Sequence, residues 1–415
     1  RPNCVLITEF YGESDAELRD KVARLEAHLD KQQVGATAVT KAFEPALQAN
    51  VWTVRKVGLG LMMSIKGDHK PIPFIEDAAV QPEHLAEYVT RLERFCNDLG
   101  TQVAYYAHAS AGCIHIRPLI NQKLAADVAK LPQIVAFATE MLGEYGGSLS
   151  SEHGDGRALS WMNERFFGPA LYGLYKQVKQ IFDPQDIFNP GNIVDSKPMT
   201  ENLRYGADYA VTASYGAIQA PYLDFSADGG FDRAVEMCNG AGICRKRTTG
   251  TMCPSFMVTR EEEHSTRGRA NLLRAALSGT LPPEELTGPR IYEAMDLCIE
   301  CKACKAECPS AVDMAKIKFE YLAHYYEAHG VPPRTRLFAN IGALNARGAS
   351  LNSSLANWIT NNGLMLFARP FLGITNNRPL PTLSSNPLPA WFKKRQSGQT
   401  AAADSDTLRV ALFHD

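Results

Sequence analysis

The sequence of 415 residues lacks several common features, and each absence narrows its function. No apolar stretch reaches about eighteen residues without interruption, the minimum for a transmembrane helix: residues 51–65 include Arg55 and Lys56, and residues 351–372 include Asn, Arg and Pro. The formal charge is only −2 and no basic stripe is present, so we expect no nucleic-acid partner. A P-loop and a G-x-G-x-x-G fingerprint are also missing, so no nucleotide site of those kinds is expected.

Cysteine, in contrast, is concentrated in one region. Cys298, Cys301, Cys304 and Cys308, followed by Pro309, have the spacing C-x2-C-x2-C-x3-C-P. This spacing is typical of bacterial ferredoxins, in which three close thiolates bind one iron–sulfur cluster and the fourth binds a neighbouring cluster. A zinc site, the main alternative, usually uses two pairs separated by a longer loop, and disulfides would be strained in so short a segment. The spacing therefore predicts an electron-transfer protein with a 4Fe-4S cluster.

An incomplete copy of the same pattern lies upstream. Cys238 and Cys244 are six residues apart, Ala241 stands where the middle cysteine would be, and Cys253 is followed by proline. If the fourth cysteines are exchanged between the copies, Cys253 completes the cluster of the three close thiolates, and Cys308 joins Cys238 and Cys244. This second site, with three thiolates, leaves three alternatives open: a three-iron cluster, a four-iron cluster with another ligand, or no cluster. One cluster is the minimum count.

The hydrophobic pattern indicates an α+β domain over residues 1–197. We expect helices at 15–31, 45–65, 82–99, 123–145 and 163–182, and strands at 4–10, 36–40, 103–109 and 114–119. A linker at 198–232 leads to a helical cysteine domain at 233–348, with helices at 266–278 and 314–329. Residues 349–415 are expected to form a tail, a linker and the start of a further domain, with a strand at 409–413. We interpret the chain as an internal segment of a longer protein. The remaining cysteines, Cys4, Cys96 and Cys113, are expected to be buried thiols.

Two histidines in the first domain could bind a metal ion. If residues 111–112 form a two-residue hairpin turn, His108 and His115 stand opposite each other with Cβ atoms about 5 Å apart. Two imidazoles at that distance can share a divalent ion. Glu152 and His153, in a loop rich in glycine, offer further ligands. Ordinary core or surface histidines remain the alternative interpretation.

Taken together, these segments resemble known redox enzymes. Residues 108–118, 150–157 and 183–193 resemble the C-terminal half of FAD-linked oxidases of the vanillyl-alcohol-oxidase type, and most closely the D-lactate, D-2-hydroxyglutarate and glycolate dehydrogenases. The cysteine region, through residues 253–256, 265–269 and 298–309, resembles the iron–sulfur subunit of glycolate oxidase. Both in one chain resemble the large fused bacterial D-2-hydroxyacid dehydrogenases. This resemblance implies an FAD-linked oxidase C-terminal (cap or substrate) domain followed by an α-helical ferredoxin-like domain.

The resemblance also implies roles for individual residues. The ligands of a divalent ion, Zn or Mn, would be His108, His115 and Glu152, and the catalytic base would be His153. The flavin would be contacted by Glu152 together with three residues in the loops at 154–157 and 189: Gly154, Arg157 and Asn189.

Three cations are candidates for binding the substrate. Arg55 and Lys70 resemble the family's carboxylate-binding stretch, with Arg55 suited to a bidentate contact. The alternative is that Arg55 is a solvated charge on an amphipathic helix. Arg117 stands where the D-2-hydroxyglutarate branch tends to have Asn; it could bind a second carboxylate or repel the metal ion.

The expected activity is oxidation of a D-2-hydroxy acid, similar to D-2-hydroxyglutarate or D-lactate, to the 2-oxo acid. The resemblance implies that FAD, bound mostly by an upstream domain, passes electrons to the 4Fe-4S cluster and on to a quinone or redox protein. The competing hypothesis is a non-catalytic electron-transfer module that docks a separate flavoprotein. We expect a cytoplasmic protein; peripheral association with the inner membrane and homo-oligomer formation are left open.

Overall fold

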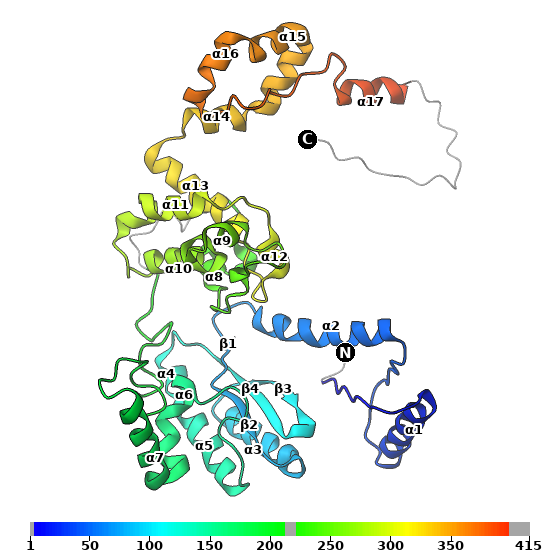
Figure 1. Ribbon diagram of the computed structural model, residues 1–415, viewed down its shortest axis with the longest axis vertical. Helices are drawn as coiled ribbons and strands as arrows, with labels where there is room; N and C mark the ends of the chain where they lie inside the picture. The colour runs from blue at the N-terminus through cyan, green and yellow to red at the C-terminus, as the bar shows by residue number, and fades with distance from the viewer. Residues whose placement is uncertain (1–3, 212–220, 398–415) are drawn as a thin grey trace. The chain divides into compact units, whose positions relative to one another are not determined.

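The computed structural model describes residues 4–211 and 221–397, and the chain forms two compact units, residues 1–320 and 321–415. The first unit contains a small sheet with helices, followed by a helical cysteine region, so the predicted α+β class is confirmed (Figure 1). Among the described residues, no helix is long and apolar enough to cross a membrane. The strand predicted at 409–413 lies outside the described residues.

The sheet is antiparallel and is centred on strand β4 (Cys113–Ile120). Strand β2 (Ile75–Ala79) pairs with one edge of β4 and β3 (Val103–His108) with the other, while the short β1 (Lys70–Pro71) pairs with the C-terminal end of β4. Side chains alternate between the two faces of a strand. The isoleucines of β4, at positions 114, 116 and 120, lie in the apolar core. His115 and Arg117 therefore lie on the opposite face.

Two helices cover the apolar face of the sheet. Helix α3 (Leu85–Asp98), which follows the turn η1 (Pro82–His84), buries Tyr88, Leu92 and Cys96 at helical spacing. Helix α5 (Lys130–Glu144) buries an apolar stripe that includes Ile134 and Met141. The helix predicted at 123–145 is in fact two helices, the short α4 (Ala125–Val128) and α5. This core fixes the orientation of β4 and leaves its other face for polar residues.

The hairpin between β3 and β4 has a longer loop than predicted. The turn η2 (Ala109–Ala111) and Gly112, which is left-handed at φ 69°, form a four-residue loop. Consequently His108 pairs with Cys113, and His115 pairs with Tyr106. The predicted pairing of His108 with His115 is therefore wrong. The two histidines still share one face as diagonal neighbours, with ring centroids 5.4 Å apart.

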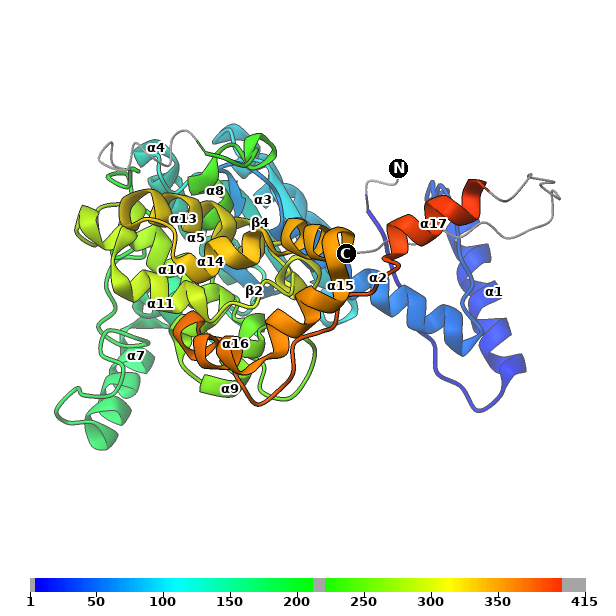
Figure 2. The same ribbon diagram turned by 90° about the horizontal axis from the view of Figure 1, so that it is seen from above.

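The N-terminal segment is helical and extended rather than stranded. Helices α1 (Asp15–Lys31) and α2 (Pro45–Met63) form as expected, the first capped by the Ser14 side chain. The strands predicted at 4–10 and 36–40 are wrong: both segments are irregular, and Figure 2 shows a loop between α1 and α2. Within the described part of the chain no strand lies beside them to pair their backbone groups. The apolar side chains of Val5 and Leu6 are accordingly exposed.

The remaining elements of the first unit are helical. After the sheet come α6 (Gly156–Leu159), η3 (Ser160–Met162) and α7 (Asn163–Phe182), the last kinked at Gly168. The cysteine region contains η5 (Ser226–Asp228), α8 (Phe231–Glu236), η6 (Ile243–Arg245), α9 (Pro254–Thr259), η7 (Glu262–His264), α10 (Thr266–Leu277), η8 (Pro283–Thr287), α11 (Pro289–Asp296), α12 (Ala303–Glu307) and α13 (Met314–His329).

The second unit, which begins within α13, is also helical. Its elements are α14 (Pro333–Ala339), α15 (Ile341–Asn361), α16 (Gly363–Ala368), η9 (Pro370–Leu372) and α17 (Leu388–Ser397). The predicted end of the cysteine domain at residue 348 falls inside α15.

Substitution of Gly112 tests the hairpin loop. A Cβ atom at this position would lie 1.7 Å from the carbonyl oxygen of Val80, whereas a Cβ at Gly100, which has a similar φ of 70°, would meet nothing within 4 Å. We expect Gly100→Ala to lower the free energy of unfolding by about 1–2 kcal/mol, the cost of the left-handed conformation. Gly112→Ala should add a steric cost of about 1–3 kcal/mol. Denaturant unfolding of the two variants measures the difference; equal shifts would contradict the close approach to Val80.

Candidate active site and cysteine centre

A β-bulge in β2 brings two acidic residues to the polar face of β4. Ile75 pairs with Ile116 and Ala78 pairs with Ile114, so Glu76 and Asp77 together stand opposite the single residue His115. Bulges of this kind redirect side chains and are frequent next to active sites. As a result, both acidic groups are turned toward the residues that the sequence analysis selected.

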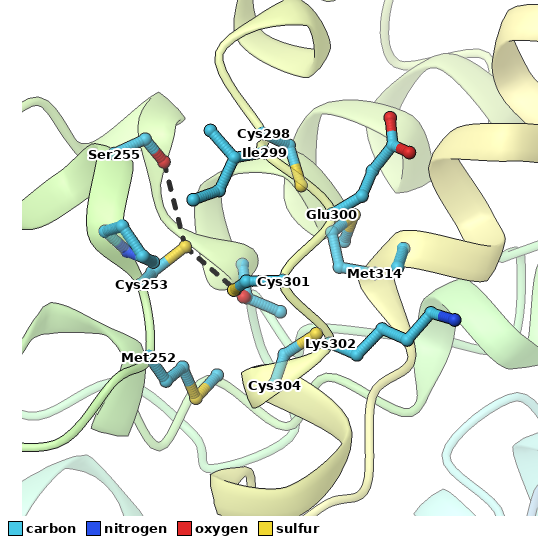
Figure 3. A pocket seen from close by; sticks show the side chains of 13 residues that line it. Met252, Cys253, Ser255, Cys298, Ile299, Glu300, Cys301, Lys302, Cys304 and Met314 are labelled. Carbon is cyan, nitrogen blue, oxygen red and sulfur yellow. Dashed lines mark hydrogen bonds between the residues drawn. The ribbon is translucent and has the colours of Figure 1, made fainter. Parts of the chain in front are cut away.

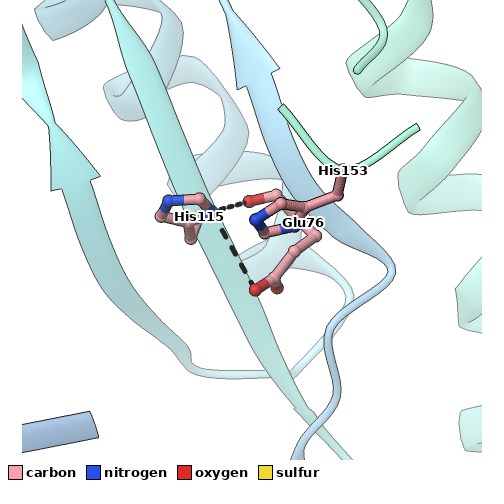
Figure 4. Close-up of side chains that lie close together, drawn as sticks. All are labelled: Glu76, His115 and His153. Atoms are coloured by element: carbon pink, nitrogen blue, oxygen red, sulfur yellow. Dashed lines mark hydrogen bonds and ion pairs between the residues drawn. The ribbon is translucent and has the colours of Figure 1, made fainter. Parts of the chain in front are cut away.

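Glu76 determines which ring nitrogen of His115 carries the proton. The Glu76 carbonyl oxygen is hydrogen-bonded to Nδ1 of His115 (Figure 4). Because a carbonyl oxygen can only accept, Nδ1 must carry the proton, and in the neutral ring Nε2 keeps its lone pair. The His115 side chain is almost fully buried, with its Nε2 at 3.7 Å from a carboxylate oxygen of Glu152. Metal-binding histidines usually have this arrangement, in which one ring nitrogen donates to a carbonyl oxygen and the other is free to bind the ion.

His108, His115 and Glu152 meet as predicted. Their possible ligand atoms lie within 4.8 Å of one another, and Nε2 of His108 is 3.9 Å from the Glu152 carboxylate. Two imidazole nitrogens and a carboxylate oxygen form a ligand set that suits zinc or manganese. These three residues therefore fit a divalent ion by both proximity and chemistry.

The contact between Arg55 and His108 competes with such an ion. Arg55, on α2, lies over the ring of Tyr106 at 4.3 Å and contacts Nδ1 of His108 at 3.2 Å. A guanidinium only donates, so Nδ1 accepts and the proton of neutral His108 is on Nε2, which faces Glu152. Binding of an ion by this nitrogen therefore requires Arg55 to leave Nδ1.

His153 is next to this group and is accessible. Its ring stacks on that of His115 with centroids 5.4 Å apart, and its Nε2 is 3.8 Å from the Glu152 carboxylate. The side chain is half exposed. Glu76, His115 and His153 also form a second group of possible ligands (Figure 4). A half-exposed imidazole beside a carboxylate is placed to exchange a proton with a bound molecule.

Asp77 holds the loop that carries Glu152 and His153, a role that the sequence analysis missed. One of its carboxylate oxygens accepts hydrogen bonds from the Ser150 hydroxyl at 2.8 Å and from the backbone N–H groups of Glu152 and His153 at 2.5 and 2.7 Å. Burial would raise the pKa of Asp77, but these donors outweigh it and hold the pKa below its usual value. The only local signal was an acidic pair inside an apolar strand.

The other predicted cations are placed differently. Lys70 donates to the Ile65 carbonyl at 2.6 Å and contacts the Met237 sulfur at 3.3 Å, and burial lowers the pKa of its amine. The structure therefore does not bring Lys70 to Arg55. Arg117 is largely buried and is ion-paired with Glu76, so its charge is compensated.

Of the residues predicted to contact the flavin, Glu152 and Gly154 lie in the loop beside the histidine group, whereas Arg157 and Asn189 make no hydrogen bond to it in the described residues. Gly154 and Gly156 have φ values of 80° and 50°, which give the loop after His153 its tight course. Arg157 and Asn189 are exposed. Their role therefore stays a prediction.

Four cysteines line one pocket, as the exchange of fourth cysteines predicted. Cys253, at the start of α9, faces Cys298 and Cys301, in the loop before α12, and Cys304, in the first turn of α12 (Figure 3). Left-handed residues at 300 and 302 turn this loop so that the thiols converge. Burial raises the pKa of the Cys298 and Cys304 thiols. Four convergent thiols are the ligand set of a 4Fe-4S cluster, which this pocket fits.

The other three cysteines of the region are near one another. Burial chiefly raises the pKa of Cys238, and the charges of Cys244 and Cys308 add to the effect. Ala241, in the position of the missing cysteine, is exposed. Outside the region, Cys96 and Cys113 are buried as expected, but Cys4 is exposed, because its segment packs in no described core.

Comparisons with known proteins agree with this arrangement. Residues 1–193 match the family described as FAD linked oxidases, C-terminal domain, and residues 237–313 match the family described as 4Fe-4S dicluster domain. The resemblance predicted from the sequence motifs is confirmed, as is the order of an oxidase domain followed by an iron–sulfur domain. FAD and a 4Fe-4S cluster are the cofactors that these families imply.

Several curated proteins are similar to the chain. A D-2-hydroxyglutarate dehydrogenase of Escherichia coli (strain K12) is 29% identical over 387 residues, which covers 81% of this chain and 36% of the relative. One from Pseudomonas putida (strain KT2440) is 30% identical over 372 residues, with the same two coverages of 81% and 36%. A D-lactate dehydrogenase of Archaeoglobus fulgidus is 30% identical over 191 residues, 46% of this chain and 39% of the relative. The chain thus spans little more than a third of the length of these relatives.

The Asp77→Asn variant tests how the loop is held. Loss of the charge weakens hydrogen bonds that are each worth about 1.5–3 kcal/mol when charge-assisted. We expect amide exchange in residues 150–153 to accelerate about tenfold or more, measured by hydrogen–deuterium exchange of the peptide that contains them. Ser150→Ala, which removes only one of the three bonds, should have a smaller effect; an effect as large as that of Asp77→Asn would contradict the account.

The same interaction predicts a dependence on pH. The pKa of Asp77 is lower in the folded protein than in the unfolded chain. Its stabilising contribution is therefore complete above the usual carboxyl pKa near 4 and disappears as the pH falls through the lowered value. Asp77→Asn should lack this part of the acid loss of stability, measured as the unfolding midpoint between neutral and low pH.

Proposed function

We propose that this chain, which carries a C-terminal domain of the FAD-linked oxidases and a 4Fe-4S domain, is the substrate-oxidising and electron-transfer part of a D-2-hydroxyacid dehydrogenase. The observation that supports this most directly is the meeting of His108, His115, Glu152 and His153 on one face of the sheet. The proposed substrate is a D-2-hydroxy acid similar to D-2-hydroxyglutarate or D-lactate, after the relatives' names.

The reaction removes the hydroxyl proton and the Cα hydride of the acid and leaves the 2-oxo acid. FAD, when bound, supplies the hydride acceptor, and a divalent ion such as zinc or manganese, when bound, acidifies the hydroxyl. His153 accepts the hydroxyl proton on its ring, because it is the most exposed of the three histidines and is not among the three proposed ligands of the ion. His115 is less suited to this role, since it is buried and its Nε2 lone pair is a proposed ligand of the ion.

Arg55 is the proposed partner of the substrate carboxylate. Among the described residues, its guanidinium contacts Nδ1 of His108 and the rings of Tyr106 and Trp52, so a carboxylate offers it a stronger, bidentate partner. When Arg55 moves to the substrate, Nδ1 of His108 becomes free to carry the ring proton, and Nε2 can then offer its lone pair to the ion. Arg117, on β4, is ion-paired with Glu76 and so helps to hold the residue that contacts His115.

Cys253, Cys298, Cys301 and Cys304 would hold the 4Fe-4S cluster, which would accept electrons from the flavin one at a time. The acceptor beyond the cluster is a quinone or a redox protein. This divides the work between the two domains: the first takes two electrons from the substrate, and the second passes them on singly.

The His153→Gln variant of the complete protein tests the proposed base. Loss of a general base typically costs about 10²–10⁴ in rate, so we expect flavin reduction by D-2-hydroxy acids to slow by that factor in anaerobic rapid mixing. His28→Gln, a change of the same kind on the exposed surface of α1, should have no effect. Normal flavin reduction in His153→Gln with every D-2-hydroxy acid tried would contradict the proposal.

The count of clusters is tested by analysis of iron and acid-labile sulfide per chain. Four irons are expected if only the four-thiol pocket is filled, and Cys301→Ser should then remove most of them. Seven or eight irons would mean that the site of Cys238, Cys244 and Cys308 is also filled. An iron-free protein that contains zinc would contradict the cluster assignment.

A further inference from the structure

Helix α10 carries a fully buried arginine. Arg269 is 0% exposed, and its helix is capped by Ser265, whose side chain accepts a hydrogen bond from the N–H of Gly268. Gly268 allows the helix to approach the preceding turn closely, because a Cβ there would lie 2.0 Å from the Glu262 carbonyl oxygen. The start of α10 is thus packed closely against this turn, and the charged side chain of Arg269 is fully buried there.

The contacts of Arg269 are almost all neutral. Its Nε donates to the Ala294 carbonyl at 2.5 Å, Nη1 donates to the His264 carbonyl at 2.7 Å, and Nη2 donates to the Ser255 hydroxyl at 3.0 Å. The remaining contact is from Nη1 to the sulfur of Cys253 at 3.6 Å. In the described part of the chain, no carboxylate is within ion-pair distance of Arg269.

A buried charge without a counter-charge is strongly unfavourable. The neighbouring lysine and arginine of the region avoid this: Lys318, which donates to the Cys298 carbonyl at 2.6 Å, is paired with Glu300 at 3.0 Å, and Arg267 is paired with Glu262 at 2.7 Å. Arg269 differs from both, because the groups near it in the described residues that can become anions are proposed cluster ligands: its guanidinium contacts the Cys253 sulfur, and its charge also acts on the Cys298 thiol.

We propose that Arg269 is the fixed counter-charge of the iron–sulfur site and raises its reduction potential. This rests on the proposed assignment of Cys253, Cys298, Cys301 and Cys304 as the cluster ligands. Reduction adds one electron, and hence one negative charge, to the cluster. A buried guanidinium that contacts a ligand sulfur stabilises that added charge more than it stabilises the oxidised state, because the low dielectric strengthens the attraction. Its hydrogen bond to the sulfur acts in the same direction.

The contacts also give Arg269 a structural role that must be separated from the electrostatic one. It joins the Cys253 side of the pocket, through Ser255 and His264, to the end of α11, through Ala294. A purely structural residue would change how much cluster is bound. A potential-setting residue changes the midpoint of the cluster that remains bound.

The test is a redox titration of the complete cluster-loaded protein, in which spin resonance and absorbance near 400 nm monitor the iron–sulfur cluster. Arg269→Gln and Arg269→Met remove the charge, Arg269→Lys keeps it, and Arg290→Met removes an exposed charge that is paired with Glu263. We expect at least a tenfold shift of the reduction equilibrium against the reduced state in the two neutral variants, which is about 59 mV toward negative potentials for one electron. Arg269→Lys and Arg290→Met should titrate close to the unchanged protein.

Iron content, measured on the same samples, separates the outcomes. Neutral variants that bind less iron but titrate at the unchanged midpoint would overturn the proposal, as would Arg269→Lys with a shift as large as that of Arg269→Gln. If the neutral variants bind no iron, Arg269→Lys decides: an unchanged midpoint supports the proposal, and loss of its iron too overturns it. Absence of iron from the unsubstituted protein would instead refute the cluster assignment.

Discussion

The pairing of β4 with β2 and β3 is the constraint on which the site depends. One face of β4 is held in the apolar core by its isoleucines, so His115 and Arg117 are presented on the other face. The bulge in β2 then places Glu76 and Asp77 opposite His115, and Asp77 fixes the loop with His153. A slip of one residue in this register would send the histidine into the core and the isoleucines to the site.

In the cysteine region the proposed cluster ligands come from two separate segments of the chain. Cys253 precedes α9, whereas its three partners lie in the loop before α12 and in the first turn of that helix. The buried Arg269 ties the two sides together and supplies positive charge. The proposed chemistry needs both regions, because a hydroxy acid gives up two electrons at once and a cluster accepts one at a time.

The sequence predicted those features that depend on local spacing. The spacing of the run from Cys298 to Cys308 predicted a cluster site. The prediction that Cys253 joins this run agrees with the pocket, which Cys253 lines together with Cys298, Cys301 and Cys304. The two histidines were identified although the loop, and therefore the pairing, was wrong. Other features depend on contacts distant in sequence and leave no local pattern: the bulge that recruits Asp77, and the burial of Arg269 against Ala294. The strands predicted at 4–10 and 36–40 are wrong because a strand-like apolar run does not form a strand without a partner, and none lies beside these segments in the described residues.

The central claim is that electrons from a D-2-hydroxy acid reach the cluster bound by this chain. It is tested most directly by mixing the complete protein anaerobically with the acid and following the flavin and cluster absorbance together. The account predicts that the flavin bleaches first and that the cluster is then reduced by the same substrate, without any added reductant. A flavin that is fully reduced while the cluster stays oxidised, although dithionite can reduce it, would contradict the account.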